Sequence, residues 1–364
     1  MKVPDNIKMQ TGQMLMAGLN GTTLDQDAED LIKNHHIGGF ILFERNFENP
    51  DQLADFISDL QTLSQSHSPG VPLFISVDQE GGRVARLKAP FTDFPVAGVL
   101  GQAKSEALAY KFGTALAEEL TAVGINMDFA PVLDVHTNPA NPVIGDRALS
   151  ADPEWAGKLG GAIIRAFNDK GLLPVGKHFP GHGDTHLDSH LELPTVDKDK
   201  EALENVELIP FIRNIKEGLD AIMMAHVVYP AWDPDYPATF SETILENILR
   251  KQLGFHGIAF SDDLDMKAIE DHVAMESIPS LGIQAGLDVF LVCHDNDKIR
   301  TLHDLMIKGV ERGDISREKV GRAVQRIAAV KSKINITRTE RPNEIFCAFD
   351  HQNVAEEMKS FMSS

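Results

Sequence analysis

The sequence predicts a single (β/α)8 barrel of the TIM type, an α/β fold, with a short helical extension at its C-terminal end. Three observations carry this prediction. Short apolar runs rich in β-branched residues recur eight times in the 364 residues, helical segments separate most of them, and polar residues follow several runs where strands would end. No G-x-G-x-x-G fingerprint follows the first run, which counts against a dinucleotide-binding doubly wound sheet.

The eight apolar runs are the expected barrel strands. Most of them lack the polar alternation of a half-exposed strand, so we expect strands that are buried on both faces of a parallel sheet. The runs occupy residues 14–19, 38–43, 73–78, 125–135, 172–179, 221–228, 257–264 and 288–293.

Three of the segments between the runs show clear helix signals, at residues 105–124, 152–171 and 241–254. Each opens with a Ser or Asp of the capping type and closes on Gly. After the last strand, residues 316–335 predict one more helix. We therefore expect a barrel domain over residues 1–335 and a tail over residues 336–364.

The tail reads as a polar segment followed by a short amphipathic stretch, "VAEEMKSFM" (354–362). This stretch could dock on the barrel, exchange with a partner chain, or stay mobile. Sequence alone leaves these three options open.

The charge balance limits the partners. Lys plus Arg is 34 and Asp plus Glu is 54, a formal net charge of −20, whereas nucleic acids and anionic membranes select basic surfaces. The N-terminal residues have no apolar signal-peptide core, and no apolar stretch of about 18 residues predicts a membrane span. Cys293 and Cys347 are far apart in sequence, and Cys293 ends an apolar run. We expect a reduced, cytoplasmic protein.

Polar residues fall where four of the predicted strands end. The carboxyl ends of parallel strands meet at one face of a barrel, where barrel enzymes build their active sites. The sequence therefore predicts a site at this face. The residues concerned are Asp78, Lys177, His178, His226, Asp262 and Asp263.

The segment "KHFPGHGDTHLDSH" (177–190) carries a histidine at every fourth position, as a metal-binding helix face would. Pro180, Gly181 and Gly183 argue against a helix here, so the spacing does not indicate a column of ligands. The sequence holds no H-E-x-x-H pattern and no paired C-x-x-C, and Lys177 stands beside a presumed ligand. We expect no metal and no cofactor, with a loop-bound metal as the alternative. The four histidines are His178, His182, His186 and His190.

A loop for a hydroxyl-rich ligand explains the same segment better. Glycine and proline set sharp turns and let backbone approach a ligand closely. Lys177 and His178 offer hydrogen-bond donors at the strand end. Asp188 lies two residues from His190, so its carboxylate could orient that imidazole for proton transfer. A hydrogen bond that merely stabilises the loop is the alternative for this pair.

Four motifs in order resemble family 3 glycoside hydrolases, and most closely their single-domain bacterial β-N-acetylhexosaminidases of the NagZ type. The resemblance runs from about residue 10 to about residue 335. The motifs are "VDQEGGRV" (77–84), "NPVIGDRALS" (141–150), "KHFPGHGDTHLDSH" (177–190) and "FSDDLDM" (260–266).

The resemblance implies roles for eight residues. It implies that Asp262 is the nucleophile, a choice over Asp263 that the residues alone leave open. It implies that His190 is the general acid/base, with Asp188 as its partner. Five further positions match residues that hold the sugar, although the first Arg among them could be a solvated surface residue. These positions are Asp78, Arg86, Arg147, Lys177 and His178.

The implied activity is that of a retaining exo-β-N-acetylglucosaminidase that removes terminal GlcNAc, with GlcNAc-anhydro-N-acetylmuramyl fragments of peptidoglycan recycling as the expected substrate. A retaining glycosidase needs a nucleophile and an acid/base on the two sides of the scissile bond. An imidazole suits the second role, because its pKa lies near neutrality and it adds no second negative charge beside the nucleophile.

Other functions stay open at this point. They are a β-glycosidase or glycoside phosphorylase of the same family with another sugar specificity, a metal-dependent hydrolase that uses the histidines, and a sugar-binding barrel without turnover. The expected partner is a small carbohydrate or muropeptide, with no nucleic acid and no membrane, and the chain is expected to be a monomer or a weak homodimer.

Overall fold

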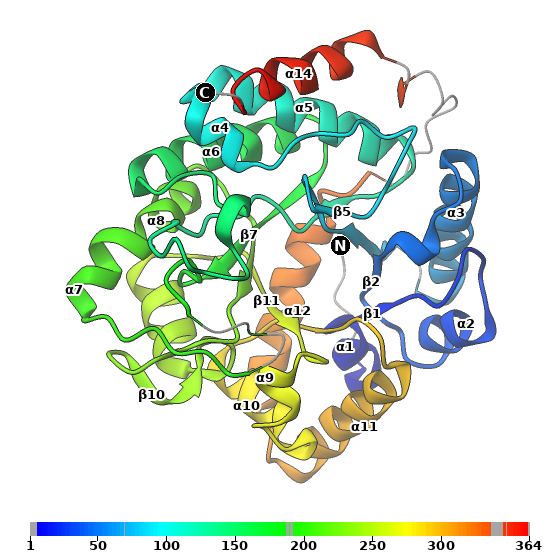
Figure 1. Cartoon of the computed structure of the whole chain (residues 1–364). Coiled ribbons are helices and arrows are strands. Elements are labelled where there is room, and N and C mark those ends of the chain that lie inside the picture. The colour runs from blue at the N-terminus through cyan, green and yellow to red at the C-terminus, as the bar shows by residue number, and fades with distance from the viewer. Residues whose placement is uncertain are drawn as a thin grey trace.

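The computed structural model describes residues 6–68, 70–186, 189, 192–335, 345–346 and 348–362. At its centre eight parallel strands close into a barrel in the order β1-β12-β11-β8-β7-β6-β3-β2, and helices surround them (Figure 1). The predicted (β/α)8 fold is therefore confirmed. The barrel strands are β1 (Leu15–Gly18), β2 (Gly39–Leu42), β3 (Phe74–Val77), β6 (Met127–Asp128), β7 (Leu173–Phe179), β8 (Ala221–Met224), β11 (Ile258–Asp263) and β12 (Val289–Val292).

The helices of the outer layer follow the strands along the chain. They are α1 (Ile7–Gln13), α2 (Gln26–Lys33), α3 (Pro50–His67), α4 (Gly98–Ala103), α5 (Glu106–Ala122), α6 (Pro153–Asp169), α7 (Lys200–Ala202), α8 (Ile209–Lys216), α9 (Lys267–Glu270), α10 (Ile278–Ala285), α11 (Asn296–Arg312), α12 (Arg317–Lys331) and α14 (Phe349–Lys359). Two π-helices, η3 (Leu203–Glu207) and η5 (Thr243–Gln252), also belong to this layer. None of the helices in the described part of the chain is long and apolar enough to cross a membrane.

Short elements complete the loops that follow the carboxyl ends of barrel strands. They are the hairpin strands β4 (Gln79–Gly81) and β5 (Val84–Ala85), the hairpin strands β9 (Val228–Tyr229) and β10 (Asp233–Pro237), and the 3-10 turns η1 (Glu44–Asn46), η2 (Gly145–Arg147), η4 (Ala238–Phe240) and η6 (Met275–Ser277).

Each predicted strand contains a barrel strand, but two are shorter than expected. Within the run 125–135, only β6 forms a regular ladder of hydrogen bonds with its neighbouring strands. Pro131, which follows, has no N–H to donate to a neighbouring strand. Leu133 nevertheless donates its N–H to the carbonyl of Lys177 on β7. The run 221–228 ends its barrel part at Met224 and then enters the β9–β10 hairpin.

The predicted helix boundaries hold where capping residues set them. The Ser105 side chain accepts the N–H of Leu108 at the start of α5, and that of Asp152 accepts two N–H groups at the start of α6. Gly124, just after α5, has a φ of 92°, a left-handed conformation that favours glycine. The third predicted helix, 241–254, is present as the π-helix η5.

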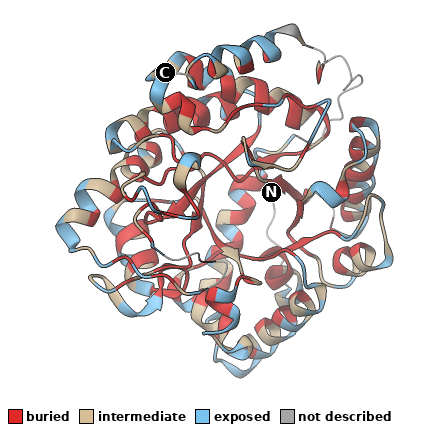
Figure 2. Cartoon of the chain, viewed as in Figure 1, coloured by how far each residue is buried: buried red, intermediate tan, exposed pale blue. Residues whose placement is uncertain are grey.

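An aromatic layer fills the barrel interior. Phe260 on β11 contacts Phe74 on β3, with ring centroids 6.3 Å apart, and contacts Phe129 with centroids 5.8 Å apart. All three side chains are fully or almost fully buried, and buried residues concentrate at the centre of the molecule (Figure 2). Because Phe129 also lines the cavity described below, this layer forms part of the floor of that cavity.

The C-terminal stretch docks on the outside of the barrel, the first of the three options. Helix α14 packs against α5 and α4, and Figure 1 shows it beside them at the edge of the molecule. His351 on α14 lies between two carboxylates of α5: its Nδ1 is 3.0 Å from Glu119 and its Nε2 is 2.9 Å from Glu118. Burial opposes protonation of His351, but the two carboxylates prevail and raise its pKa.

The docking of α14 should therefore weaken as the pH rises. The folded protein holds the His351 proton to a higher pH than the unfolded chain does. This stabilisation is fully present below the unfolded pKa of about 6.5 and is lost as the pH rises through the higher folded value. Hydrogen exchange of α14 should be faster at pH 9 than at pH 6 after correction for the intrinsic rate. His351→Gln should remove that difference; an unchanged difference would contradict the assignment.

Candidate active site

A polar cavity of about 430 Å³ opens at the carboxyl ends of the barrel strands. It collects residues that are distant in sequence but lie at or near the ends of β2, β3, β7, β11 and β12. The sequence predicted the contributions of β3, β7 and β11, whereas those of β2 and β12 were not predicted and the predicted His226 after β8 does not line the cavity. The five predicted sugar-binding residues and the predicted nucleophile all line it. These are Asp78, Arg86, Arg147, Lys177, His178 and Asp262.

A buried charge cluster forms one wall of the cavity. The Lys177 ammonium on β7 lies 2.7 Å from Asp78 and 2.6 Å from Glu80 on β4. The Arg147 guanidinium, at the end of η2, donates to both oxygens of Glu80 at 2.8 Å. Glu80 thus holds both predicted sugar-binding cations, and the paired geometry fixes the orientation of the Arg147 fork.

The pKa values of three members of the cluster, Glu80, Lys177 and Arg147, are shifted toward the charged form. Burial opposes ionisation of Glu80, yet Arg147 and Lys177 hold its pKa far below the usual range. Burial likewise opposes the charge of Lys177, but Asp78 and Glu80 raise its pKa, and Glu80 does the same for Arg147. The wall therefore presents fixed charges to a ligand.

Arg86 lies at the mouth of the cavity, directly after β5. Its Nη2 is 3.9 Å from Asp78 Oδ2, and its guanidinium lies 5.7 Å from the centre of the Phe43 ring. The side chain is 36% exposed, so it is a cavity residue with one side open to solvent.

A second part of the cavity wall depends on Asp134, a fully buried carboxylate after β6. Its Oδ2 accepts a hydrogen bond from Nδ1 of His178 at 2.7 Å, and its Oδ1 accepts from the backbone N–H groups of His178 and His182. Burial opposes ionisation of Asp134, but His178 lowers its pKa. Asp134 fixes the His178 ring with Nε2 directed to the cavity, 4.0 Å from Oδ2 of Asp262.

Asp262, near the end of β11, is set up as an anion. Its Oδ1 accepts the backbone N–H of Asp263 at 2.8 Å. Burial raises the pKa, but His178 and His226 outweigh this effect and the net pKa is lowered. His226 itself is not a cavity residue. Its ring is fully buried and bonds to Thr239 and to the carbonyl of Asp263.

Asp263 is a different kind of carboxyl group. Its Oδ1 accepts the backbone N–H groups of Cys293 and Asp265 and so ties the end of β11 to the end of β12. Burial raises the pKa of Asp263 to about 7. The two adjacent aspartates therefore differ: Asp262 is an anion facing His178, and Asp263 is a structural tie that titrates near neutrality.

The loop after β7 packs against the loop that precedes η2. Asn141 donates to the carbonyl of His182 at 2.9 Å and to the hydroxyl of Thr185 at 3.1 Å. The His182 ring bonds to Thr185 at Nδ1 and to Ser189 at Nε2, and burial together with His178 lowers its pKa to about 4. Ser189 lines the cavity. The predicted dyad, Asp188 and His190, lies outside the described residues.

The regular histidine spacing has no helical meaning where the chain is described. His178 lies in β7, and residues 181–186 form turns and bends. His182 bonds to two hydroxyls, and His186 bonds to Asn138 at the rim of the loop. Among the described residues no group of three or more His, Cys, Asp or Glu could hold a metal ion.

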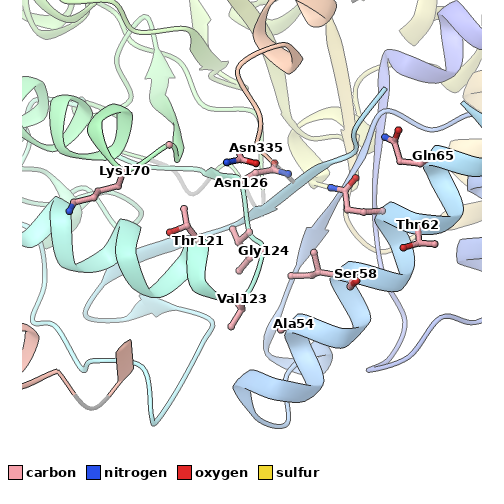
Figure 3. A pocket seen from close by; sticks show the side chains of 14 residues that line it. Ala54, Ser58, Thr62, Gln65, Thr121, Val123, Gly124, Asn126, Lys170 and Asn335 are labelled. Atoms are coloured by element: carbon pink, nitrogen blue, oxygen red, sulfur yellow. The ribbon is translucent and has the colours of Figure 1, made fainter. Parts of the chain in front are cut away.

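A second cavity, of about 480 Å³, lies at the opposite end of the barrel. Figure 3 shows residues of α3, such as Ser58 and Thr62, facing the segment around Gly124 just before β6. Among the described residues that line it, Lys170 is the one with a charged side chain, and it is paired with Glu118. Without converging titratable groups, this cavity has no equipment for acid–base or nucleophilic chemistry, and the polar cavity is the candidate active site.

Two residues of the site had no role assigned from the sequence, Glu80 and Asp134. Glu80 stands inside a quoted motif, and an acidic residue next to "GGR" after a strand could have been noticed. Asp134 lies near the end of the apolar run 125–135, and a charge in a buried segment needs a partner. Both act by holding cations or imidazoles that touch the cavity.

The fold and site together define a barrel enzyme for a polar, hydroxyl-rich ligand, with an ionised aspartate among fixed charges. Residues 6–330 match the family model described as the glycosyl hydrolase family 3 N terminal domain. The chain belongs to glycosyl hydrolase family 3.

Within this family, the chain is similar to β-hexosaminidases and β-N-acetylglucosaminidases. The chain is 37% identical over 335 residues to Beta-hexosaminidase A of Pseudoalteromonas piscicida, covering 86% of this chain but only 56% of the relative. The solved β-N-acetylglucosaminidase of Paenibacillus sp. str. FPU-7 superposes with a TM-score of 0.94 at 38% identity, over 98% of this chain and 69% of that one. NagZ from Neisseria gonorrhoeae, solved with N-trifluoroacetyl-D-glucosamine, gives 0.79 at 34% identity, over 96% and 97% of the two chains.

Glu80→Gln tests the charge cluster. It should lower the free energy of unfolding by about 3 kcal/mol, because Arg147 and Lys177 lose a buried counter-charge. It should also lower kcat/KM about 10- to 100-fold through misplacement of both cations. Urea unfolding and initial rates measure the two effects. Glu44→Gln, an exposed glutamate beside the cavity residue Phe43, is the matched control. Equal behaviour of the two variants would contradict the role of Glu80.

Proposed function

We propose that the protein is a retaining exo-β-N-acetylglucosaminidase that acts through a covalent glycosyl intermediate on Asp262. The observation that carries the proposal is the ionised Asp262 carboxylate in a polar cavity of a family 3 barrel. The similarity to hexosaminidases and N-acetylglucosaminidases supports the choice of sugar.

The electrostatics of the site support Asp262 over its neighbour as the nucleophile. A carboxylate must be ionised to attack a sugar carbon, and the pKa of Asp262 is lowered whereas that of Asp263 is raised to about 7. Asp263 also has its Oδ1 engaged by two backbone N–H groups. In the proposed mechanism Asp78, Arg86, Arg147, Lys177 and His178 hold the hydroxyls and the N-acetyl group of the sugar.

The proposed general acid/base is His190, with Asp188 as its partner. The support is the resemblance of the motif and the position of Ser189, which lies between them in sequence and lines the cavity. In the first step the imidazolium protonates the leaving oxygen while Asp262 attacks. In the second step the neutral imidazole takes a proton from water, which releases the sugar from Asp262.

The proposed substrates are GlcNAc-anhydro-N-acetylmuramyl fragments in peptidoglycan recycling, handled in the cytoplasm by a monomer or a weak homodimer. The likeness to NagZ over nearly the full length of both chains supports this assignment. In this proposal residues 1–335 form the catalytic domain, and the tail 336–364 contributes α14 to the outside of the barrel.

Substitution of the nucleophile gives the first test. Asp262→Asn should lower the turnover of a chromogenic aryl β-GlcNAc glycoside by about 1,000-fold or more, because the amide cannot form the glycosyl ester. Asp263→Asn is the matched control and should lose less than about 10-fold, since an amide oxygen can still accept the two N–H groups. Equal rates for wild type and Asp262→Asn would refute the nucleophile assignment.

Leaving-group dependence tests the acid/base. His190→Ala should lose about 100-fold or more on a phenyl glycoside, whose leaving group needs a proton, and much less on a 2,4-dinitrophenyl glycoside, whose leaving group does not. The measurement is kcat/KM for both substrates. An equal loss on the two substrates would count against an acid role for His190.

One assay also separates the alternatives. GlcNAc and glucose aryl glycosides should be compared side by side, in phosphate and in non-phosphate buffer, with and without chelator. Preference for glucose would indicate a β-glycosidase with another sugar specificity. A sugar phosphate product would indicate a phosphorylase, and loss of activity with the chelator would indicate a metal-dependent hydrolase. Binding of GlcNAc with no product would indicate a sugar-binding barrel.

A further inference from the structure

A partly buried ionic cluster around the fully buried Glu207 lies at the base of the loop that follows β7, outside the described lining of the active-site cavity. Its members come from four places along the chain: Thr137 before η2, Asp184 in the loop, Lys198 after the loop, and Glu207 at the end of the π-helix η3. None of these four residues has a role in the proposed mechanism, and none belongs to the charge cluster around Glu80.

The loop backbone packs directly on Glu207. Gly181 has a φ of 138°, and a Cβ at this position would lie 2.8 Å from Cβ of Glu207 and 3.0 Å from its Oε2. The Tyr229 hydroxyl donates to the carbonyl of Gly181 at 2.6 Å from the other direction. The loop therefore starts from a fixed point, with no room for a side chain between its backbone and the carboxylate.

One ammonium group joins the two ends of the loop. Nζ of Lys198 is 2.9 Å from Oε1 of Glu207 and 3.3 Å from Oδ1 of Asp184. The Thr137 hydroxyl lies 3.2 Å from the Asp184 carboxylate, to which it donates. Because Asp184 precedes and Lys198 follows the segment that contains positions 188 and 190, this triad closes the segment at its base and reduces its conformational freedom.

A carboxylate is a costly choice at this position if stability alone mattered. The Glu207 side chain is fully buried, and its Oε2 has no hydrogen-bond partner among the described residues. Burial raises its pKa to about 7; Lys198 lowers it, and the carboxylates of Asp134 and Asp184 raise it further. An apolar residue would avoid this burial cost, so the charge indicates a requirement for a defined geometry.

The loop transmits that geometry to the reacting groups through described contacts. His182, the residue after Gly181, donates its backbone N–H to Asp134, which holds His178 against Asp262. The His182 ring bonds to Ser189 at 3.0 Å, and Ser189 lines the cavity. A shift of the loop base would therefore disturb two contacts of His182: the one to Asp134, which orients His178, and the one to Ser189, which lies between positions 188 and 190.

We propose that Glu207 is a positioning residue for the proposed general acid/base: it binds Lys198, which also binds Asp184, and so ties together the two ends of the segment 184–198 and reduces the range of positions open to the proposed acid/base. This inference rests on the proposed function. Glu207 touches no reacting atom, and its contribution is confined to the steps that need proton transfer by the loop.

Glu207→Gln tests the inference, because it keeps the shape and removes the charge. On a phenyl β-GlcNAc glycoside its kcat/KM should fall about 10-fold or more, a part of the 100- to 10,000-fold that a positioned acid contributes. On the 2,4-dinitrophenyl glycoside the loss should stay below about 3-fold. Glu204→Gln, an exposed glutamate of the same π-helix, is the matched control and should match wild type on both substrates.

Azide adds a readout that a purely structural defect would not change. Azide attacks a glycosyl enzyme without needing a base, so it should speed 2,4-dinitrophenyl glycoside turnover by Glu207→Gln and leave Glu204→Gln unaffected. Lys198→Gln, at a partly exposed position, should give the same pattern if Glu207→Gln does not fold. Lys198→Arg should retain more activity on the phenyl glycoside than Lys198→Gln does, because it keeps the bridging charge.

The outcomes separate this inference from the proposed function. No release of either aryl group by wild type and Glu204→Gln would remove the proposed function itself. If wild type is active and the Glu207 and Lys198 variants lose activity equally on both substrates, the positioning role is wrong. The same holds if these variants lose no activity. Either result would leave the proposed function intact.

Discussion

The bidentate pair between Glu80 and Arg147, joined by Lys177, is the interaction on which the active site depends. It links β4, η2 and β7 at the mouth of the barrel. Each of these charges is buried, and burying any one of them without its partners would cost free energy of folding, so the three side chains stabilise one another only as a group. That requirement fixes the positions of the two cations before any ligand arrives, which is the condition for electrostatic preorganisation.

A second carboxylate organises the other half of the site in the same manner. Asp134 orients His178 and accepts the N–H of His182, so one buried anion sets both an imidazole in the cavity and the start of the loop after β7. Beneath the cavity, Phe129 packs on the buried ring of Phe260 and forms part of the cavity floor. Between these walls Asp262 remains ionised although it is buried, because the surrounding imidazoles offset the cost.

Much of this arrangement could be predicted from the residues. Apolar runs located every barrel strand, and a capping Ser or Asp with a closing Gly located the helix ends. The rule that barrel sites form at carboxyl ends of strands brought Asp78, Lys177 and Asp262 together correctly. Glu80 and Asp134 escaped assignment, since their partners come from other strands and nothing in local spacing indicates a cross-barrel pair.

The sequence by itself determined the closed barrel, the face that carries the site, and the family, because periodicity and short motifs are local properties. Tertiary structure alone decided which aspartate of the adjacent pair is an anion and which is a tie between strands. It also decided that one ammonium, Lys198, closes the loop through Glu207 and Asp184. The reason is physical: the pKa of a buried group depends on its burial and on charges that the fold brings from distant parts of the chain.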